Sequence, residues 1–401
     1  MDKNLIAKFN QLNDLLKKEG FNSSVLCGDT ILLLKDKLTK LCPHQKILLL
    51  TSNLSNNKDV IDKIKEQDIN VTALEKQPES LSVDNALDMF NTPEDIRLVL
   101  CVDYALLDFA LYYSKVKKVP LLYLANNISL KNAFKTHLRI QNGKNYDVIE
   151  LSYDRHVLID ESLLSNSSFM HYAVYEDVVS NAFTLIDYRI VRYIRKKSTY
   201  QNSYLLAKST IQNTYGILQK PLKERNVYLA LASLSIGIAN FISRGKFLSG
   251  LTFNVLENYG VDLTGLKLEF CIRLIKLSLA VFKDGVTTKT MPDYETRIKR
   301  SCKEFNEDFG KTLTAFLKAK KAYLSAEKAI SEFIKINEQE LLKLCKSLNV
   351  AISISNTLSK EKQKNNKDIN NVIDFGADFK ESFNLLTFLR EKGVLEFIKN
   401  D

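Results

Sequence analysis

The chain has 401 residues, of which 45% are hydrophobic and 26% are charged, and its formal net charge is +10. This length exceeds what one hydrophobic core usually organises, so the composition is typical of a globular protein of two domains and excludes a largely disordered one. Residues 1–12 carry charges and amides instead of a continuous apolar stretch. We therefore expect neither a secretory signal nor a membrane anchor, and we expect a cytoplasmic protein.

The first 160 residues alternate short runs rich in β-forming residues with stretches of helical periodicity. In Asp59–Gln67 and Tyr104–Lys115, apolar residues recur every three or four positions, as they do in crossover helices. The alternation predicts a Rossmann-like, doubly wound parallel sheet. We interpret Gln141–Tyr146 as a surface turn. The predicted strands are Ser23–Cys27, Lys46–Thr51, Ile69–Leu74, Arg97–Val102 and Val119–Leu124.

Residues 161–401 are typical of a helical domain. Apolar residues of Glu176–Lys197 fall on one face, which predicts a packed helix. Val227–Ile242 is apolar nearly all round, but its 16 residues are fewer than the roughly 20 that cross a bilayer, so we expect a central buried helix and no membrane span. Further helices are predicted over Leu266–Phe282, in Lys311–Leu344 and, after a polar break at 360–371, over Phe379–Ile398.

Neither the basic residues nor the cysteines indicate a nucleic-acid or zinc-binding protein. The densest basic run closes a predicted helix, where cations offset the macrodipole, and no aromatic-studded basic groove accompanies it. The cysteines lack Cys-x-x-Cys spacing, so buried free thiols are expected. The basic run is Arg192, Arg195, Lys196 and Lys197, and the cysteines are Cys27, Cys42, Cys101, Cys271, Cys302 and Cys345.

Three stretches give the chain a resemblance to a known family. They are Val157–Ile190, Ala232–Gly250 (ASLSIGIANFISRGKFLSG) and the C-terminal ADFKESFNLLTFLREKGVLEFI. In this order they resemble the superfamily of iron-containing alcohol dehydrogenases, glycerol dehydrogenases and dehydroquinate synthases, and within it the sn-glycerol-1-phosphate dehydrogenases. The resemblance implies a dehydroquinate synthase-like fold, with a Rossmann-like α/β domain over 1–160, a helical domain over 161–401, and homo-oligomers.

The family binds its nucleotide at a glycine-rich turn, where backbone N–H groups approach the pyrophosphate at a helix N-terminus. The matching residues in this chain are Val102, Asp103, Tyr104 and Ala105. Their side chains occupy that space, and like charges about 4 Å apart repel by about 4 kcal/mol at an effective dielectric constant of 20. We therefore expect no cofactor.

Two residues stand at positions where the family contacts its cofactor. Asp108 matches the family's aspartate, although a solvated helix residue is an equal interpretation, and Ser129 matches the serine of its PTxxS segment. Asn126 and Asn127 precede that serine, where they fit either a turn or a polar pocket. Asp108 and Ser129 are thus the candidate cofactor-binding residues.

The family holds zinc or iron with one aspartate and two histidines. Asp177 stands at the aspartate position, whereas Phe253 and Thr264 replace the histidines, and no histidine follows His171. One carboxylate does not hold a catalytic transition metal, so we expect no metal site. Two alternatives stay open, a replacement site from Glu257, Asp262, Glu269 and Cys271, and a cluster of His156 and His171 with Asp177.

Without these glycines and histidines, the family's hydride transfer loses its cofactor site and its polarising metal. We therefore expect a degenerate, non-catalytic relative, a pseudoenzyme whose interdomain cleft binds a small anionic ligand or serves a partner. Arg244, retained in the matched loop, is the candidate anion contact, and a structural ion pair is its alternative role. The alternative function is an active NAD(P)-dependent, metal-independent alcohol or polyol-phosphate dehydrogenase.

Overall fold

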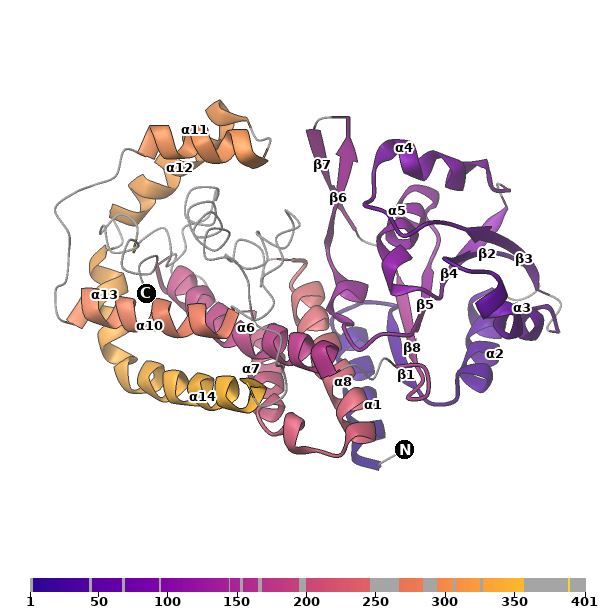
Figure 1. Ribbon diagram of the computed structural model, residues 1–401, viewed down its shortest axis with the longest axis horizontal. Coiled ribbons are helices and arrows are strands. Elements are labelled where there is room, and N and C mark those ends of the chain that lie inside the picture. The colour runs from indigo at the N-terminus through magenta and orange to yellow at the C-terminus, as the bar shows by residue number, and fades with distance from the viewer. Residues whose placement is uncertain are drawn as a thin grey trace. The chain divides into compact units, whose positions relative to one another are not determined.

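Six parallel strands form the centre of the first of two units in the computed structural model (Figure 1). This unit comprises residues 1–171 and 219–245. The strand order is β1-β8-β5-β4-β2-β3, and all five pairs are parallel. The strands are β1 (Ser24–Cys27), β2 (Lys46–Thr51), β3 (Asn70–Glu75), β4 (Ile96–Cys101), β5 (Leu121–Ala125) and β8 (Arg155–Ile159).

The apolar runs of the sequence become strands because both faces of the sheet are covered. Residues 47–50 of β2 and 98–101 of β4 are fully buried, which is the pattern of a parallel sheet between two layers of helices. The five predicted strands are confirmed, with ends that shift by one or two residues. The sixth, β8, begins two residues before the stretch Val157–Ile190 that carries the family resemblance and ends within it.

Helices on the connections between strands complete this unit. Leu34 and Leu38 of α2 and Ile64 of α3 belong to one core cluster with Ile47 and Leu98 of the sheet. The predicted crossover helices are confirmed as α3 and α5, whereas α1 and α2 were not predicted. The bounds are α1 (Lys3–Lys18), α2 (Thr30–Leu41), α3 (Lys58–Lys65) and α5 (Leu107–Lys117).

A β-hairpin follows the sheet strand β5 along the chain. Strands β6 (His137–Asn142) and β7 (Asn145–Glu150) pair antiparallel around Gly143, whose φ is 59°. The prediction of a turn over Gln141–Tyr146 is therefore wrong at both ends, which belong to strands. The alternation that makes β6 a strand is visible in the buried Leu138 and Ile140 between more exposed neighbours.

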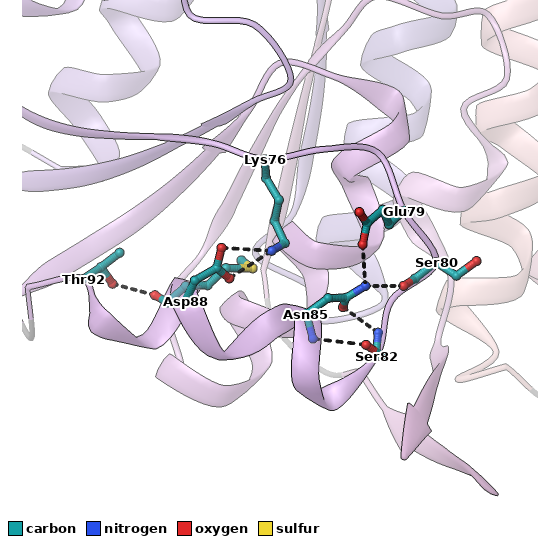
Figure 2. Close-up of polar contacts among 8 residues, drawn as sticks. Lys76, Glu79, Ser80, Ser82, Asn85, Asp88 and Thr92 are labelled. Carbon is teal, nitrogen blue, oxygen red and sulfur yellow. Dashed lines mark hydrogen bonds and ion pairs between the residues drawn. The ribbon is translucent and has the colours of Figure 1, made fainter. Parts of the chain in front are cut away.

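The segment after β3 is fixed by its own polar contacts (Figure 2). Helix α4 (Val83–Ala86) begins with a capping box, in which Ser82 Oγ accepts the N–H of Asn85 and Asn85 Oδ1 accepts the N–H of Ser82. In the following 3₁₀ turn, both carboxylate oxygens of Asp88 accept hydrogen bonds from Lys76 Nζ, at 2.9 and 3.1 Å. Lys76, which follows β3, thereby ties this segment to the end of the strand.

Helix α8 (Leu222–Ile242) also belongs to the first unit, although the sequence division at residue 160 assigned it to the helical domain. It packs on a short 3₁₀ turn, Lys131–Phe134. Our argument that this helix is too short for a bilayer is wrong, because it begins earlier than predicted and has 21 residues. Within the described part of the chain, Glu224–Ile242 is the one stretch with the length and hydropathy of a membrane span, and 83% of it is buried inside the protein. That burial fits the expected core helix.

The second unit comprises residues 172–218 and 246–401, and its described elements are helices. Helix α10 packs against α13 and α14. Where one or two helices are predicted in Lys311–Leu344, the structure has α12, α13 and the start of α14. The bounds are α6 (Ser168–Ile194), α7 (Gln201–Thr214), α10 (Lys267–Lys283), α11 (Tyr294–Phe305), α12 (Phe309–Leu324), α13 (Glu327–Ile336) and α14 (Glu338–Asn356).

The structure describes residues 3–42, 45–66, 69–93, 95–143, 145–151, 154–164, 168–194, 200–245, 267–283, 294–305, 308–324, 327–356 and 389. The predicted break at 360–371 and final helix Phe379–Ile398 lie outside them, apart from the helical Leu389. All six cysteines are described and free, as predicted, and all but Cys27 are buried.

Candidate functional site

The carboxyl ends of neighbouring parallel strands meet at one edge of the sheet, and ligands of open α/β sheets bind outside that edge. Thr51 ends β2, Asp103 lies just beyond β4, and Asn126 follows β5. Because these strands are adjacent in the order β5-β4-β2, their end residues come together. This edge contains the loop that the resemblance assigns to nucleotide binding.

The carboxylate of Asp103 is the centre of this edge. Its Oδ2 accepts hydrogen bonds from the backbone N–H of Ser52 at 2.6 Å and from the hydroxyls of Ser52 and Thr51, both at 3.0 Å. Its Oδ1 accepts a hydrogen bond of 3.3 Å from Asn126 Nδ2. Four donors from two neighbouring strand ends thus surround one charge, so the Asp103 side chain cross-links β4 to β2 and to β5.

The backbone N–H groups at the start of α5 are engaged within the loop. The N–H of Tyr104 donates to Asn126 Oδ1, that of Leu106 donates to the Asp103 carbonyl, and that of Leu107 donates to the Tyr104 carbonyl. The Tyr104 hydroxyl accepts a further hydrogen bond from Asn132. A pyrophosphate needs such N–H groups exposed and a neutral surrounding. The N–H groups of Tyr104, Leu106 and Leu107 are already hydrogen-bonded, and Asp103 adds a carboxylate beside them. Residues 102–107 therefore do not fit a pyrophosphate.

The two candidate cofactor residues lie at the same edge, each with a contact inside the protein. Asp108, in the first turn of α5, forms an ion pair of 2.5 Å with Lys135 Nζ. The N–H of Ser129 donates to Asn127 Oδ1 at 2.7 Å, which forms a local turn. Asn127 therefore has the turn role that was one of its two interpretations, whereas Asn126 bonds to Asp103.

Asp177 of α6, which the resemblance places at the family's metal-ligand position, is paired with a lysine. Its Oδ1 lies 2.7 Å from the Nζ of Lys267, the first residue of α10, and the exposed fractions of the two side chains are 17% and 8%. The neighbouring Glu176 accepts the backbone N–H of Lys267 at 2.8 Å and is 1% exposed. Adjacent carboxylates of α6 therefore hold one residue of α10 by its backbone and by its ammonium group.

The sequence did not single out Lys267. The available signal was a lysine at the border of a strongly apolar helix, preceding Leu268, Phe270 and Cys271. A lysine in such a position is buried only when it is paired with an opposite charge. Asp177, which lacks the two histidines of the family's metal site, was the carboxylate available for this pairing.

The described residues contain no group of three or more histidine, cysteine, aspartate or glutamate side chains that could hold a metal ion. Asp177, with an ammonium on its oxygen, does not fit the family's metal. The proposed replacement ligand Cys271 donates to the Ser180 carbonyl, and burial raises the pKa of its thiol well above the usual value. Of the other positions named for a metal, Phe253, Glu257, Asp262 and Thr264 lie outside the described residues.

Two histidines of the described residues are buried, and both have hydrogen-bond partners in the first unit. His171 Nε2 shares a short hydrogen bond with Asn226 Oδ1, and His156 Nδ1 lies 2.9 Å from Ser24 Oγ. Each of these two histidines therefore makes a structural hydrogen bond.

Arg244 lies in a tight turn directly after α8. Its φ is 53°, in the left-handed region, and its N–H donates to the Phe241 carbonyl at 2.8 Å. The next residue, Gly245, must be a glycine, because an added Cβ would collide with Thr136 and His137. The Arg244 side chain is exposed, and among the residues that the structure describes it has no ion-pair partner. The turn thus presents a guanidinium group at the surface.

No protein-family model matches the sequence, and no curated protein matches it. Solved structures match over nearly the whole chain. A sulfoacetaldehyde reductase from Bifidobacterium kashiwanohense, solved in complex with NAD+, is 10% identical with a TM-score of 0.57 over 95% of this chain and 98% of that one. The alcohol dehydrogenase ADH/D1 from an archaeal halo-thermophile of a Red Sea brine pool is 13% identical with a TM-score of 0.56 over 94% and 97%. A glycerol dehydrogenase from Schizosaccharomyces pombe is 11% identical with a TM-score of 0.53 over 94% and 89%.

At these identities the matches show the fold. Solved iron-containing alcohol dehydrogenases are also among the matches, and the chain has their fold, with a Rossmann-like parallel sheet and a set of helices. The predicted fold class is confirmed. Chemistry is a property of the site and not of the fold, so the residues at the strand ends and around Asp177 have to carry any statement about function.

Proposed function

We propose that this protein is a degenerate relative of the metal-dependent glycerol-1-phosphate dehydrogenases, which binds a small anionic ligand and does not transfer hydride. The observation that carries the proposal is the loop after β4, where Asp103 stands in place of the family's glycines and the N–H groups of Tyr104, Leu106 and Leu107 are engaged internally.

Hydride transfer by a dehydrogenase of this fold needs a nicotinamide coenzyme held by its pyrophosphate. An anchored coenzyme stays in place because several oriented N–H groups and a helix N-terminus act on its negative charge together. A carboxylate at the same loop acts in the opposite direction, since a second negative charge is repelled. The reaction then lacks its hydride source, whatever substrate the protein binds.

The anionic ligand is proposed from Arg244 and from the charge of the chain. A guanidinium group offers a planar fork of donors that matches the oxygens of a phosphate or carboxylate, and the turn after α8 holds its backbone in one conformation. The net charge of +10 favours the approach of anions in general. The resemblance to glycerol-1-phosphate dehydrogenases favours a phosphate ester.

Titration with NADH and with NADPH, followed by the fluorescence of the coenzyme, tests the absence of a coenzyme site. We expect no saturation below about 1 mM, which corresponds to a binding free energy weaker than about 4 kcal/mol. Saturable binding in the micromolar range, together with turnover of a polyol phosphate, would instead support an active NAD(P)-dependent and metal-independent dehydrogenase.

Calorimetric titration with sn-glycerol 1-phosphate, and separately with inorganic phosphate, tests the anion site. We expect Arg244→Ala to abolish binding without changing the melting temperature by more than a few degrees. Lys118→Ala is the matched control, because Lys118 is also an exposed cation with a left-handed φ, of 58°. Equal affinity of wild type and Arg244→Ala would remove Arg244 from the proposal, and a wild type that binds neither anion would contradict the ligand class.

A further inference from the structure

The pair of Asp177 and Lys267 lies where solvent screens charges poorly. Lys267 is 6% exposed as a whole residue, its side chain is 8% exposed, and that of Asp177 is 17% exposed. A carboxylate in such a place is stable only with a cation close to it, because burial of an unpaired charge is costly. In the family that the chain resembles, a metal ion is the cation on this aspartate.

The position of the Lys267 ammonium is set from the backbone. Lys267 is the first residue of α10, and the Glu176 carboxylate accepts its N–H, so a negative charge caps the positive end of that helix. With the backbone held in this way, the side chain reaches the carboxylate of the next residue along α6, where Nζ and Oδ1 are 2.7 Å apart. The cation of this site is therefore attached to the chain.

We propose that the Lys267 ammonium is the resident cation of this site and has taken the place on Asp177 that a metal ion occupies in the dehydrogenases of the family. A divalent ion and an ammonium group repel each other, so both cannot lie on one carboxylate oxygen. The site is thereby converted from one that recruits a metal into one that links α6 to α10. The inference concerns the second unit and does not depend on the result of the coenzyme titration.

A double-mutant cycle in the full-length protein tests the pairing. We expect Lys267→Met and Asp177→Asn each to lower the melting temperature by about 5 to 10 °C, because each leaves a buried charge without its partner. The double variant removes both charges, so its melting temperature should lie well above the value given by adding the two losses. Lys40→Met, which breaks the exposed pair of Lys40 and Asp36, is the control and should shift the melting temperature by about 1 °C or less.

Replacement of the ammonium from solution tests its role as a cation. We expect propylammonium to raise the melting temperature of Lys267→Ala by a few degrees, and to have no such effect on the variant that also carries Asp177→Asn. Wild type should melt at the same temperature with EDTA and with added zinc. If Lys267→Met does not fold while the double variant does, the pairing is supported.

Three results would overturn the proposal. They are a wild type that EDTA destabilises or zinc stabilises, a cycle whose two losses simply add, and a double variant no more stable than Lys267→Met. Saturable NADH binding, by contrast, would contradict the proposed function and leave the Lys267 site intact, so the two failures are distinguishable.

Discussion

The Asp103 carboxylate accepts the backbone N–H of Ser52 at 2.6 Å, and this contact joins the end of β4 to the end of β2. The bond is charge-assisted, and two hydroxyls and one amide donate to the same carboxylate. The Asp103 side chain therefore links the ends of three neighbouring strands. We infer that Asp103, whose charge would weaken the binding of a phosphate, stabilises the fold through these hydrogen bonds.

Replacement of Asp103 by alanine should destabilise the first unit. The change leaves the Ser52 N–H without its acceptor and leaves the Thr51 hydroxyl with only the Asn53 carbonyl, at 3.1 Å. We expect a loss of about 2 to 4 kcal/mol in the free energy of unfolding, measured with urea. Asp84→Ala, at an exposed carboxylate in the first turn of α4, should change it by less than about 0.5 kcal/mol. Equal midpoints for Asp103→Ala and wild type would show that the four hydrogen bonds add nothing to stability.

Much of the fold was predictable because its signals are local. Buried parallel strands give continuous apolar runs, and the five runs of the first 125 residues became strands at the expected places. The hairpin was not predicted, because the turn residues around Gly143 are a stronger local signal than the alternation of buried and exposed residues in His137–Asn142. Helix α8 was predicted to be too short because its first, more polar residues gave no apolar signal.

The site was predictable only in part, because its contacts join residues far apart in the sequence. The resemblance led to Asp177, but nothing near it indicated Lys267, which lies ninety residues away along the chain. Asp103 was recognised as a charge in the wrong place for a phosphate. The direction of its side chain, toward Thr51 and Ser52, depends on which strands are neighbours, and no local pattern gives that order.

Two buried serines of α8 should differ in their effect on stability. The Ser233 hydroxyl accepts the N–H groups of Leu130 and Lys131, both at 2.9 Å, whereas the Ser235 hydroxyl donates to the carbonyl of Leu231 in its own helix. We expect Ser233→Ala to cost about 1 to 3 kcal/mol, because it removes the acceptor of the buried Leu130 N–H and of the partly buried Lys131 N–H.

Ser235→Ala should change the free energy of unfolding by less than about 1 kcal/mol, because the Leu231 carbonyl can keep its bond within the helix. Urea unfolding of both variants under the same conditions provides the comparison. Equal losses would mean that the contact of α8 with residues 130 and 131 does not depend on the Ser233 hydroxyl.

Two glycines should respond to alanine in opposite directions. A Cβ added to Gly237 of α8 would lie 2.5 Å from the Lys131 carbonyl oxygen, a backbone atom that cannot move without shifting the 3₁₀ turn. A Cβ on Gly310 of α12 would meet only the Asp308 side chain, at 3.5 Å. Alanine is the better helix former by about 1 kcal/mol in a helix interior. This difference favours Gly237→Ala at least as much as Gly310→Ala, because Gly310 is only the second residue of α12.

We therefore expect Gly237→Ala to lower the melting temperature by several degrees and Gly310→Ala to leave it unchanged or raise it slightly. Thermal unfolding followed by circular dichroism measures both. A Gly237→Ala protein as stable as wild type would show that α8 and the turn Lys131–Phe134 are not in close contact.

The last prediction concerns His156, which is 3% exposed on β8. Burial, with a smaller effect of Lys37, lowers the pKa of this imidazole from 6.5 to about 4. The unfolded chain then binds a proton at higher pH than the folded one, so the stabilisation is complete above pH 6.5 and is lost as the pH falls toward 4. Across that window we expect a loss on the order of 3 kcal/mol from this residue.

The free energy of unfolding of wild type and of His156→Gln is measured between about pH 4.5 and about pH 7.5, a range that includes the ordinary pKa of histidine. The difference between the two proteins isolates the effect of His156. The wild-type curve should fall more steeply toward acid than that of His156→Gln, because all other titrating groups are common to both. Parallel curves for wild type and His156→Gln would mean that His156 takes up its proton in the folded protein as readily as in the unfolded chain.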